Sequence, residues 1–187
     1  QPFCQRCVIS GPTGIVGPSA SVGVSCSSGV PGPRVVVADL DSGPNTGGED
    51  DLGVFVTLYG EGFGATRGAS RVTMGGVEVA RYVEWGADQA ARKLDRIVVQ
   101  PGPSVPTGSA PIVVTVDGKS STPLAFVVRP GRVLFASPSG GDLASGTRAD
   151  PFSLQRGRNE ALAGDTVYML PGVYGAPSGG TGCDAKI

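Results

Sequence analysis

Short runs of alternating apolar and polar residues, separated by glycine and proline, fill the middle of the chain and constrain its fold most. Seven of these runs occur: 34–40, 54–60, 71–74, 77–83, 95–100, 111–116 and 124–128. Runs of this length, rich in β-branched residues and bounded by turn residues, are typical of strands. No strong helical pattern lies between them, so the sequence predicts an all-β fold of the two-sheet sandwich type.

Two dipeptides between these runs predict tight hairpins. Gly75-Gly76 and Asp117-Gly118 each separate two strand-like segments, and residues that tolerate a positive φ suit two-residue turns. In the run 54–60, alternation places Val54, Val56 and Leu58 on one face of the strand. Phe55, Thr57 and Tyr59 fall on the other face, and only one of these faces need belong to the core.

Residues 33–128 carry the ordered pieces of a known module. Ser42-Gly43-Pro44-Asn45-Thr46-Gly47-Gly48 is followed by Gly60-Glu61-Gly62-Phe63-Gly64 and then by the later strand-like runs. This order resembles the IPT/TIG domain, an immunoglobulin-like module of many cell-surface proteins. The resemblance implies a sandwich that is rarely catalytic and usually serves as a spacer, dimerisation module or carbohydrate-adjacent module. The acidic insert Glu49-Asp50-Asp51 departs from the family pattern.

The C-terminal part of the chain has a different pattern. We expect a strand at 133–137, a short helix from the N-cap Ser153 to about Ala161, and a strand in "TVYML" at 166–170. Short motifs follow one another along this part: Ser137-Pro138, Gly146-Thr147, Pro151-Phe152, Gly164-Asp165-Thr166-Val167-Tyr168 and Pro171-Gly172-Val173-Tyr174. Together they resemble the N-terminal entry of pectate-lyase-like parallel β-helix proteins. The chain departs from that pattern at Gly157, where the family usually has a larger residue.

The second resemblance implies a capping helix and the first strands of a right-handed parallel β-helix. One coil of such a fold cannot bury its apolar face alone, because several coils must stack before a core forms. The sequence therefore predicts that further strands complete the sheet. They would come either from more of the same chain or from a neighbouring subunit.

The sequence predicts three regions. Residues 1–32, rich in Gly, Pro and Ser, are expected to form an extended, disulfide-bearing arm. Residues 33–129 are expected to form the sandwich, and residues 130–187 the β-helix cap and an incomplete first coil. Gln1 is not Met, and removal of a signal peptide is the simplest account, so we expect an extracellular or cell-surface location.

Composition excludes several classes of function. The chain has no histidine, which removes His-based triads and His-ligated zinc or haem. Its net charge of −1 and the lack of a basic stripe argue against nucleic-acid binding. No run of about 20 apolar residues occurs, so no membrane span is expected.

Four cysteines are present: Cys4, Cys7, Cys26 and Cys183. Their even number and a secreted setting favour disulfides over a zinc or redox site. Cys26 is expected to pair with Cys4 or Cys7, and Cys183 with the other cysteine or between subunits.

The remaining candidate residues are acidic or aromatic. Asp39, Asp41, Asp50 and Asp51, with Asn45 and Glu49 nearby, could supply a low-affinity calcium site, although a solvated acidic loop is the favoured interpretation. Asp142 and Asp150 are expected in turn or capping roles. Tyr59, Phe63, Tyr82 and Trp85 could form a sugar-stacking platform, but core and hairpin packing is favoured. No other cofactor is expected.

The favoured function is structural or adhesive: a surface, matrix or filament component that assembles through strand or arm contacts, with a homo-oligomer as one candidate assembly. Two alternatives remain open, a non-catalytic N-terminal part of a secreted polysaccharide lyase or hydrolase, and a carbohydrate-binding module. The sequence favours a non-catalytic chain over an enzyme. These 187 residues lack paired catalytic carboxylates, and the groups used by pectate-lyase-like enzymes lie on later coils.

Overall fold

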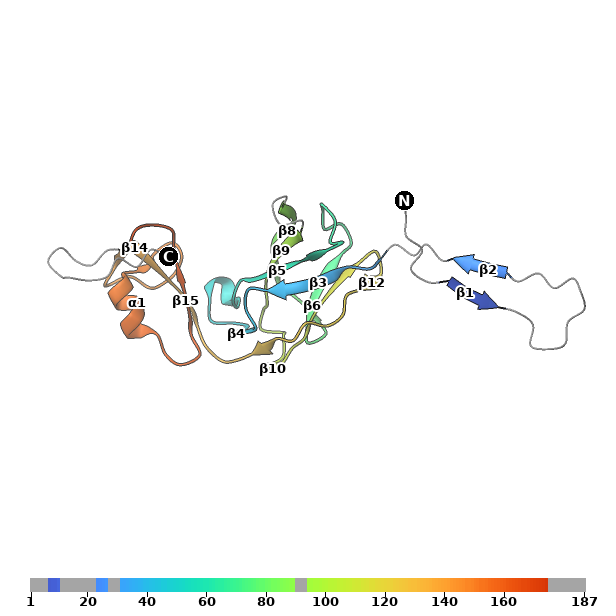
Figure 1. Cartoon of the computed structure of the whole chain (residues 1–187). Coiled ribbons are helices and arrows are strands. Elements are labelled where there is room, and N and C mark those ends of the chain that lie inside the picture. Colours follow the sequence, from blue (N-terminus) through green and yellow to red (C-terminus); the bar gives the residue numbers. More distant parts are fainter. Residues whose placement is uncertain (1–6, 11–22, 27–30, 90–93, 175–187) are drawn as a thin grey trace, which may run out of the picture. The chain divides into compact units, whose positions relative to one another are not determined.

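The computed structural model describes residues 7–10, 23–26, 31–89 and 94–174. The chain divides into two compact units, Gln1–Pro31 and Gly32–Ile187. Among the described residues, strands predominate and one α-helix is present (Figure 1). The all-β prediction is therefore confirmed, whereas the predicted boundary between residues 129 and 130 stays a prediction.

Three sheets build the sandwich region. The first is antiparallel and has the order β3 (Arg34–Ala38), β5 (Val56–Glu61), β9 (Leu94–Gln100), β8 (Arg81–Gln89). The second has the order β12 (Lys119–Ser120), β11 (Ile112–Val116), β6 (Arg71–Met74), β7 (Val77–Glu78). The third comprises β10 (Gly108–Ser109), β13 (Val127–Val128) and β4 (Ser42–Gly43), and a 3₁₀ turn, η1 (Glu49–Asp51), follows β4.

The core of the sandwich is built from alternate residues of these strands. Val54, Val56 and Leu58 are fully buried, so this face of the 54–60 run is the core face. The other fully buried large side chains are Phe63, Phe126, Met74, Ile97, Ile112, Val72, Val99 and Val114, with Val105 only 1% exposed. Burial of this many apolar side chains is the main stabilising contribution to the sandwich.

Both predicted hairpin turns are confirmed. Met74 pairs with Val77, and Val116 pairs with Lys119, so Gly75-Gly76 and Asp117-Gly118 are two-residue turns. All four turn residues have positive φ, as the primed hairpin turns require.

The prediction of one strand at 77–83 is wrong. The segment is divided: β7 ends at Glu78 in the second sheet, and β8 begins at Arg81 in the first. Val79 N donates to Val72 O, whereas Ala80 N donates to Gln100 O, so the chain changes sheets between these residues. Sequence alternation continues through the crossing and hides it. The expected strand at 124–128 is also shorter, since β13 is Val127–Val128.

The C-terminal segment forms a small β-α-β unit. β14 (Val133–Gly141) and β15 (Thr166–Met169) pair in parallel, and α1 (Leu154–Glu160) lies between them in sequence. Ser153 is the N-cap: its Oγ accepts a hydrogen bond from Arg156 N at 3.1 Å. The predicted helix and strands are confirmed, with β14 extending further than expected.

The two faces of the β14–β15 sheet contact different partners. Val133 and Phe135 belong to the core cluster of the sandwich, and Tyr168 and Leu170 pack against that cluster. The opposite face of the sheet packs in a second, small core of Leu134, Ala136 and Phe152, with Val167 and Met169 packed against it. Strand alternation therefore makes one short sheet serve two cores.

Gly157, the departure from the β-helix pattern, is the buried residue of α1. A Cβ atom built at this position would lie 3.3 Å from the Cβ of Ala136 on β14. Glycine here lets the helix approach the sheet closely, and a larger residue would push the two apart.

The N-terminal unit contains one antiparallel ribbon. β1 (Cys7–Ser10) pairs with β2 (Gly23–Cys26) over four residue pairs, from Cys7 opposite Cys26 to Ser10 opposite Gly23.

Candidate functional site

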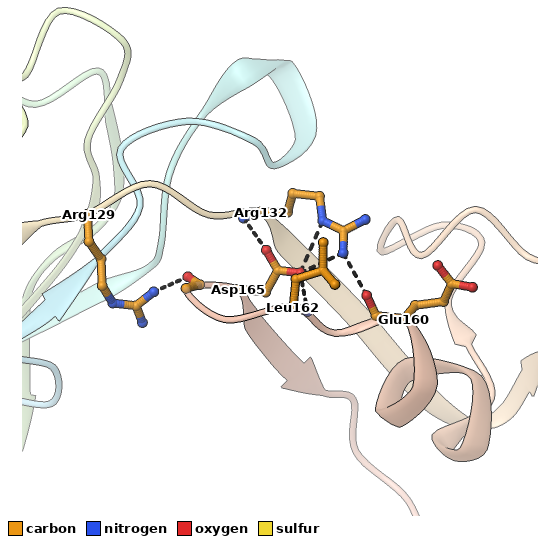
Figure 2. Close-up of polar contacts among 6 residues, drawn as sticks. Arg129, Arg132, Glu160, Leu162 and Asp165 are labelled. Atoms are coloured by element: carbon orange, nitrogen blue, oxygen red, sulfur yellow. Dashed lines mark hydrogen bonds and ion pairs between the residues drawn. The ribbon is translucent and has the colours of Figure 1, made fainter.

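A polar cluster lies where the C-terminal unit follows the sandwich in the chain, and we call this region the joint. Its centre is Asp165, whose side chain is only 3% exposed. The carboxylate accepts hydrogen bonds from Arg132 N at 2.8 Å, from Arg132 Nε at 3.0 Å and from Leu162 N at 2.9 Å (Figure 2). Arg132 Nη2 also donates to it at 2.6 Å. The carboxylate therefore ties the start of β14 to the loop between α1 and β15.

Arg132 and Arg129 extend the joint to both sides. Arg132 Nη2 donates to the carbonyl of Glu160 at 2.7 Å, which satisfies a carbonyl at the end of α1. Arg129 Nη1 donates to the carbonyl of Gly164. Figure 2 shows both arginines reaching from the 129–132 segment toward the 160–165 loop. The 160–165 loop is thus held by the side chains of Arg129 and Arg132 from the segment before β14.

The pKa values of Asp165 and Arg132 reflect this arrangement. Burial of Asp165 opposes ionisation, but hydrogen bonds from Arg132 and from the Leu162 and Arg132 amides outweigh it, so the pKa of Asp165 is lowered. The Asp165 carboxylate in turn raises the pKa of Arg132 through their hydrogen bond, against the opposing effect of burial. Both groups are charged at neutral pH and bind as an ion pair.

Two glycines allow the close approach at the joint. A Cβ atom at Gly131 would lie 2.0 Å from the carbonyl oxygen of Gly164, which no side chain could tolerate. Gly164 has a φ of +97°, a conformation that favours glycine. The Pro-Gly and Gly-Asp dipeptides on the two sides therefore permit the backbone contact that the arginines reinforce.

Tyr168 makes the second set of contacts across the joint. Its hydroxyl accepts from Phe55 N at 2.8 Å and donates to Phe55 O at 3.1 Å, so it satisfies both backbone groups just before β5. The ring packs edge-on to Phe55 at 5.4 Å and against Phe135 at 5.6 Å. Burial raises the pKa of Tyr168 to about 12, with the Phe55 backbone bond opposing and Asp39 adding to the shift.

The acidic insert provides the third set of contacts. Glu49 Oε1 accepts from Arg148 N at 2.7 Å, and Val133 N donates to Gly47 O at 3.0 Å. Asp50 pairs with Arg81 of β8 at 2.6 Å. Asp50 and Asp51 both have a φ of 55°, which is uncommon outside glycine. The insert that departs from the family pattern thus contacts both the first sheet and the C-terminal unit.

An open cavity of about 270 Å³ lies beside the joint. Its lining includes the rings of Phe55, Phe135 and Tyr168, together with Asp39 and Arg148. Aromatic faces beside one carboxylate and one guanidinium are groups that can hold a small polar ligand with an apolar face.

Three of the four calcium candidates have different protein partners. Asp39 Oδ1 accepts from Thr57 N at 2.8 Å, Asp41 Oδ1 accepts from Ser42 Oγ at 3.1 Å, and Asp50 pairs with Arg81. Asp51 lies in η1, and the nearby Asn45 is buried and donates to Val105 O. Within the described residues, no three acidic or cysteine side chains gather in a way that could hold a metal ion.

The aromatic candidates do not share one exposed surface. Phe63 is fully buried in the core, and Trp85 donates its indole N–H to Phe63 O at 3.1 Å. Tyr82 and Trp85 are half-buried neighbours, and Arg67 covers the Tyr82 ring at 4.4 Å. Tyr59 is half-buried on β5, where it pairs with Arg96 of β9. The aromatic rings that gather around a cavity are instead Phe55, Phe135 and Tyr168.

The other sequence candidates have identifiable places. Asp142 accepts from Ser153 Oγ, and Asp150 Oδ2 accepts from Ser145 N at 2.8 Å, so their predicted turn and capping roles are confirmed. No disulfide is seen in the part of the chain that the structure describes. Cys4 and Cys183 lie outside the described residues, and the pairing of all four cysteines stays a prediction.

Sequence reasoning missed the joint residues Arg129, Arg132, Asp165 and Phe55. Arg129 and Arg132 fall between the expected strands, and the hydrogen bonds join positions more than 30 residues apart. The two Gly-containing turns at 130–131 and 164–165 were the visible signal, since close backbone approach requires such residues.

One comparison with known proteins bears on the sandwich. Residues 41–128 match the family model of the IPT/TIG domain. The match begins after β3, although β3 pairs with β5 in the same sheet. The IPT/TIG resemblance is confirmed over this range, and IPT/TIG domains occur in adhesive, structural and extracellular proteins. No curated protein matches the chain.

The match to the IPT/TIG family model does not include residues 129–187. The parallel β14–β15 pair is present there, but the parallel β-helix that the sequence predicts is not shown by either the structure or the comparisons. Among the described residues, no helix has the length and apolar character needed to cross a membrane.

Proposed function

We propose that this chain is a structural segment of an extracellular or cell-surface protein. In this proposal the IPT/TIG sandwich holds the first coil of a parallel β-helix, and assembly occurs through addition of a strand to that coil. The match to a module that occurs in adhesive and structural proteins supports the first part.

The open edge of β15 is the observation that carries the proposal. Thr166 N donates to Arg132 O, and Leu170 N donates to Ala136 O, so alternate residues of β15 face β14. In a parallel strand the intervening residues, Val167 and Met169, direct their backbone groups to the other edge. That edge lies on the side of β15 away from β14, where the described sheet has no third strand. It is suited to receive another parallel strand.

An apolar hollow accompanies this edge. A cavity of about 170 Å³ is lined by α1, β14 and β15, including Leu154, Ala161, Val167 and Met169. Leu154 is 46% exposed. An additional strand would cover these side chains and enlarge the small core, which is what stacking of a second coil does.

The joint supports the role of the sandwich as a holder. The Tyr168 and Glu49 contacts fix the C-terminal unit to the sandwich at two places, and Asp165 holds the start of β14 to the loop before β15. A spacer that presents a growing sheet has to keep its first strands ordered before the later strands bind.

Sedimentation velocity of the 187-residue chain over a range of concentrations tests the proposal. We expect concentration-dependent association that Leu154→Glu abolishes, because a charge in the apolar hollow opposes burial. Leu143→Glu is the matched control, since Leu143 is 99% exposed and lies outside the hollow. A monomer at every concentration, or equal effects of the two substitutions, would contradict assembly through this face.

The cavity beside the joint favours a second candidate function, carbohydrate binding. The half-buried rings of Phe55 and Tyr168 could stack on a sugar, while Asp39 and Arg148 could bind hydroxyl or carboxylate groups. Calorimetric titration with neutral and acidic oligosaccharides tests this function. Binding that Arg148→Ala weakens by about tenfold, and that Arg71→Ala leaves unchanged, is the expected result. Absence of heat with every sugar would remove this candidate.

A further inference from the structure

The N-terminal ribbon aligns two of the four cysteines. In the β1–β2 register, Cys7 lies directly opposite Cys26. Directly opposed residues of an antiparallel pair have Cα atoms about 4.5 or 5.5 Å apart. Disulfide-bonded cysteines have Cα separations of about 4.4–6.8 Å. The backbone pairing alone therefore meets the distance requirement for a bond between these two residues.

The position of the two cysteines in the ribbon indicates what a bond between them would stabilise. Cys7 is the first residue of β1, and Cys26 is the last residue of β2. A bond at this end closes the ribbon where the chain enters and leaves it. Cys4 lies outside the four paired positions, so a Cys4–Cys26 bond would have to form beyond the register that the structure shows.

The ribbon also needs stabilisation that two short strands do not provide. Gln1–Pro31 is a compact unit separate from the rest of the chain, and its two described strands have four residues each. An isolated two-stranded ribbon is marginally stable in water at best. A cross-link that restricts the unfolded chain is the usual remedy in small extracellular units.

We propose that Cys7 and Cys26 form an intramolecular disulfide that closes the N-terminal ribbon. The two thiols lose two protons and two electrons as the Sγ–Sγ bond forms. A protein or small-molecule disulfide accepts them and is reduced to two thiols. This proposal narrows the predicted pairing of Cys26 from two partners to one, and it leaves Cys4 and Cys183 for a second bond within or between chains. It depends on an oxidising environment, as the proposed extracellular location provides, but not on strand addition at β15.

Peptide mapping can test the connectivity, because trypsin places the four cysteines in three different peptides. Cleavage after Arg6, Arg34, Arg158 and Lys186 places Cys4 in peptide 1–6, Cys7 and Cys26 in peptide 7–34, and Cys183 in peptide 159–186. The full chain is equilibrated with oxidised and reduced glutathione, denatured, alkylated with iodoacetamide and digested without reduction. We expect unlinked peptide 7–34 at the mass of its internal disulfide, with no alkyl group. Prior reduction should yield the same peptide with two alkyl groups.

Two substitutions complete the test. Cys26→Ser should leave Cys7 alkylated, whereas Cys183→Ser should leave the internal disulfide of peptide 7–34 intact. Trp85 lies in the other compact unit, so its fluorescence checks that the sandwich is folded in every variant. Peptide 7–34 linked to peptide 1–6 or 159–186, or alkylated at both cysteines after oxidation, would overturn the proposal. Either result would leave the assembly at β15 unaffected, so failure of one proposal is distinguishable from failure of the other.

Discussion

The sandwich and the β14–α1–β15 unit are built from similar short strands but are stabilised in different ways. Most of the large apolar side chains in the sandwich core are fully buried, whereas the C-terminal unit buries Leu134, Ala136 and Phe152 in a core of its own. The second unit places its other face, through Val133 and Phe135, in the core cluster of the sandwich. The comparison teaches that a unit with only a small core of its own can fold by sharing its neighbour's core.

A core truncation in the sandwich should have the largest effect and should affect both regions. Phe126 is 1% exposed, and Phe126→Ala should lower the free energy of unfolding by about 3–5 kcal/mol. Urea denaturation followed by fluorescence of Trp85, the single tryptophan, measures the sandwich. Hydrogen exchange of peptides from α1 and β15 should show that the C-terminal unit is lost in the same transition. A C-terminal unit that stays protected after the sandwich unfolds would break the comparison.

Removal of the Asp165 carboxylate should affect one region only. Asp165→Ala leaves the Arg132 guanidinium and the Leu162 amide without this acceptor, so opening of the C-terminal unit should become easier by about 2 kcal/mol. Hydrogen exchange in α1 and β15 should accelerate while the Trp85 urea midpoint is unchanged. Asp41→Ala, at an exposed carboxylate, is the control and should have little effect.

The same carboxylate predicts an acid dependence. Because the pKa of Asp165 is lowered in the folded state, its contribution is present above the ordinary value of 3.8 and is lost as pH falls through the lowered pKa. The joint should therefore loosen in acid in the native chain, as measured by near-ultraviolet circular dichroism of the tyrosines. Asp165→Ala should abolish this step, and an unchanged acid transition in the variant would contradict the assignment.

Removal of the Tyr168 hydroxyl should have a smaller effect. Tyr168→Phe keeps the ring contacts but deprives Phe55 N and Phe55 O of their partner, at a cost of about 1 kcal/mol. Because the pKa of Tyr168 is raised to about 12, its stabilising contribution is present below its ordinary value of 10 and is lost as pH rises toward 12. A pH titration of tyrosine absorbance should lose its highest-pH step in Tyr168→Phe. Survival of that step in the variant would place the late-titrating group elsewhere.

The acidic insert should contribute least. Glu49 and Arg148 are exposed, so Glu49→Gln should change the opening of the C-terminal unit by only about 0.5 kcal/mol. Exchange rates in peptides spanning 142–150 measure the effect, with Glu61→Gln at the end of β5 as the matched control. An effect as large as that of Asp165→Ala would mean that the insert, not the Arg132–Asp165 pair, holds the joint.

The elements of this fold were predictable where local chemistry decides them. Gly75-Gly76 and Asp117-Gly118 determine their turns by positive φ, and the Ser153 hydroxyl determines the start of α1. The change of sheets between Val79 and Ala80 could not be predicted, because alternation has the same period in both sheets. The joint was hidden for a different reason: Arg132 and Asp165 become partners only when β14 and β15 pair.

Hydrogen exchange of the unaltered chain over a series of urea concentrations, below its global unfolding transition, tests the dependence of the C-terminal unit on the sandwich most directly. The account predicts that amides of α1 and β15 open at a lower free energy than those of β5 and β9, and that none of them outlasts the sandwich. Amides of β15 that stay protected longer than those of β9 would show that the C-terminal unit folds independently, and would contradict the account.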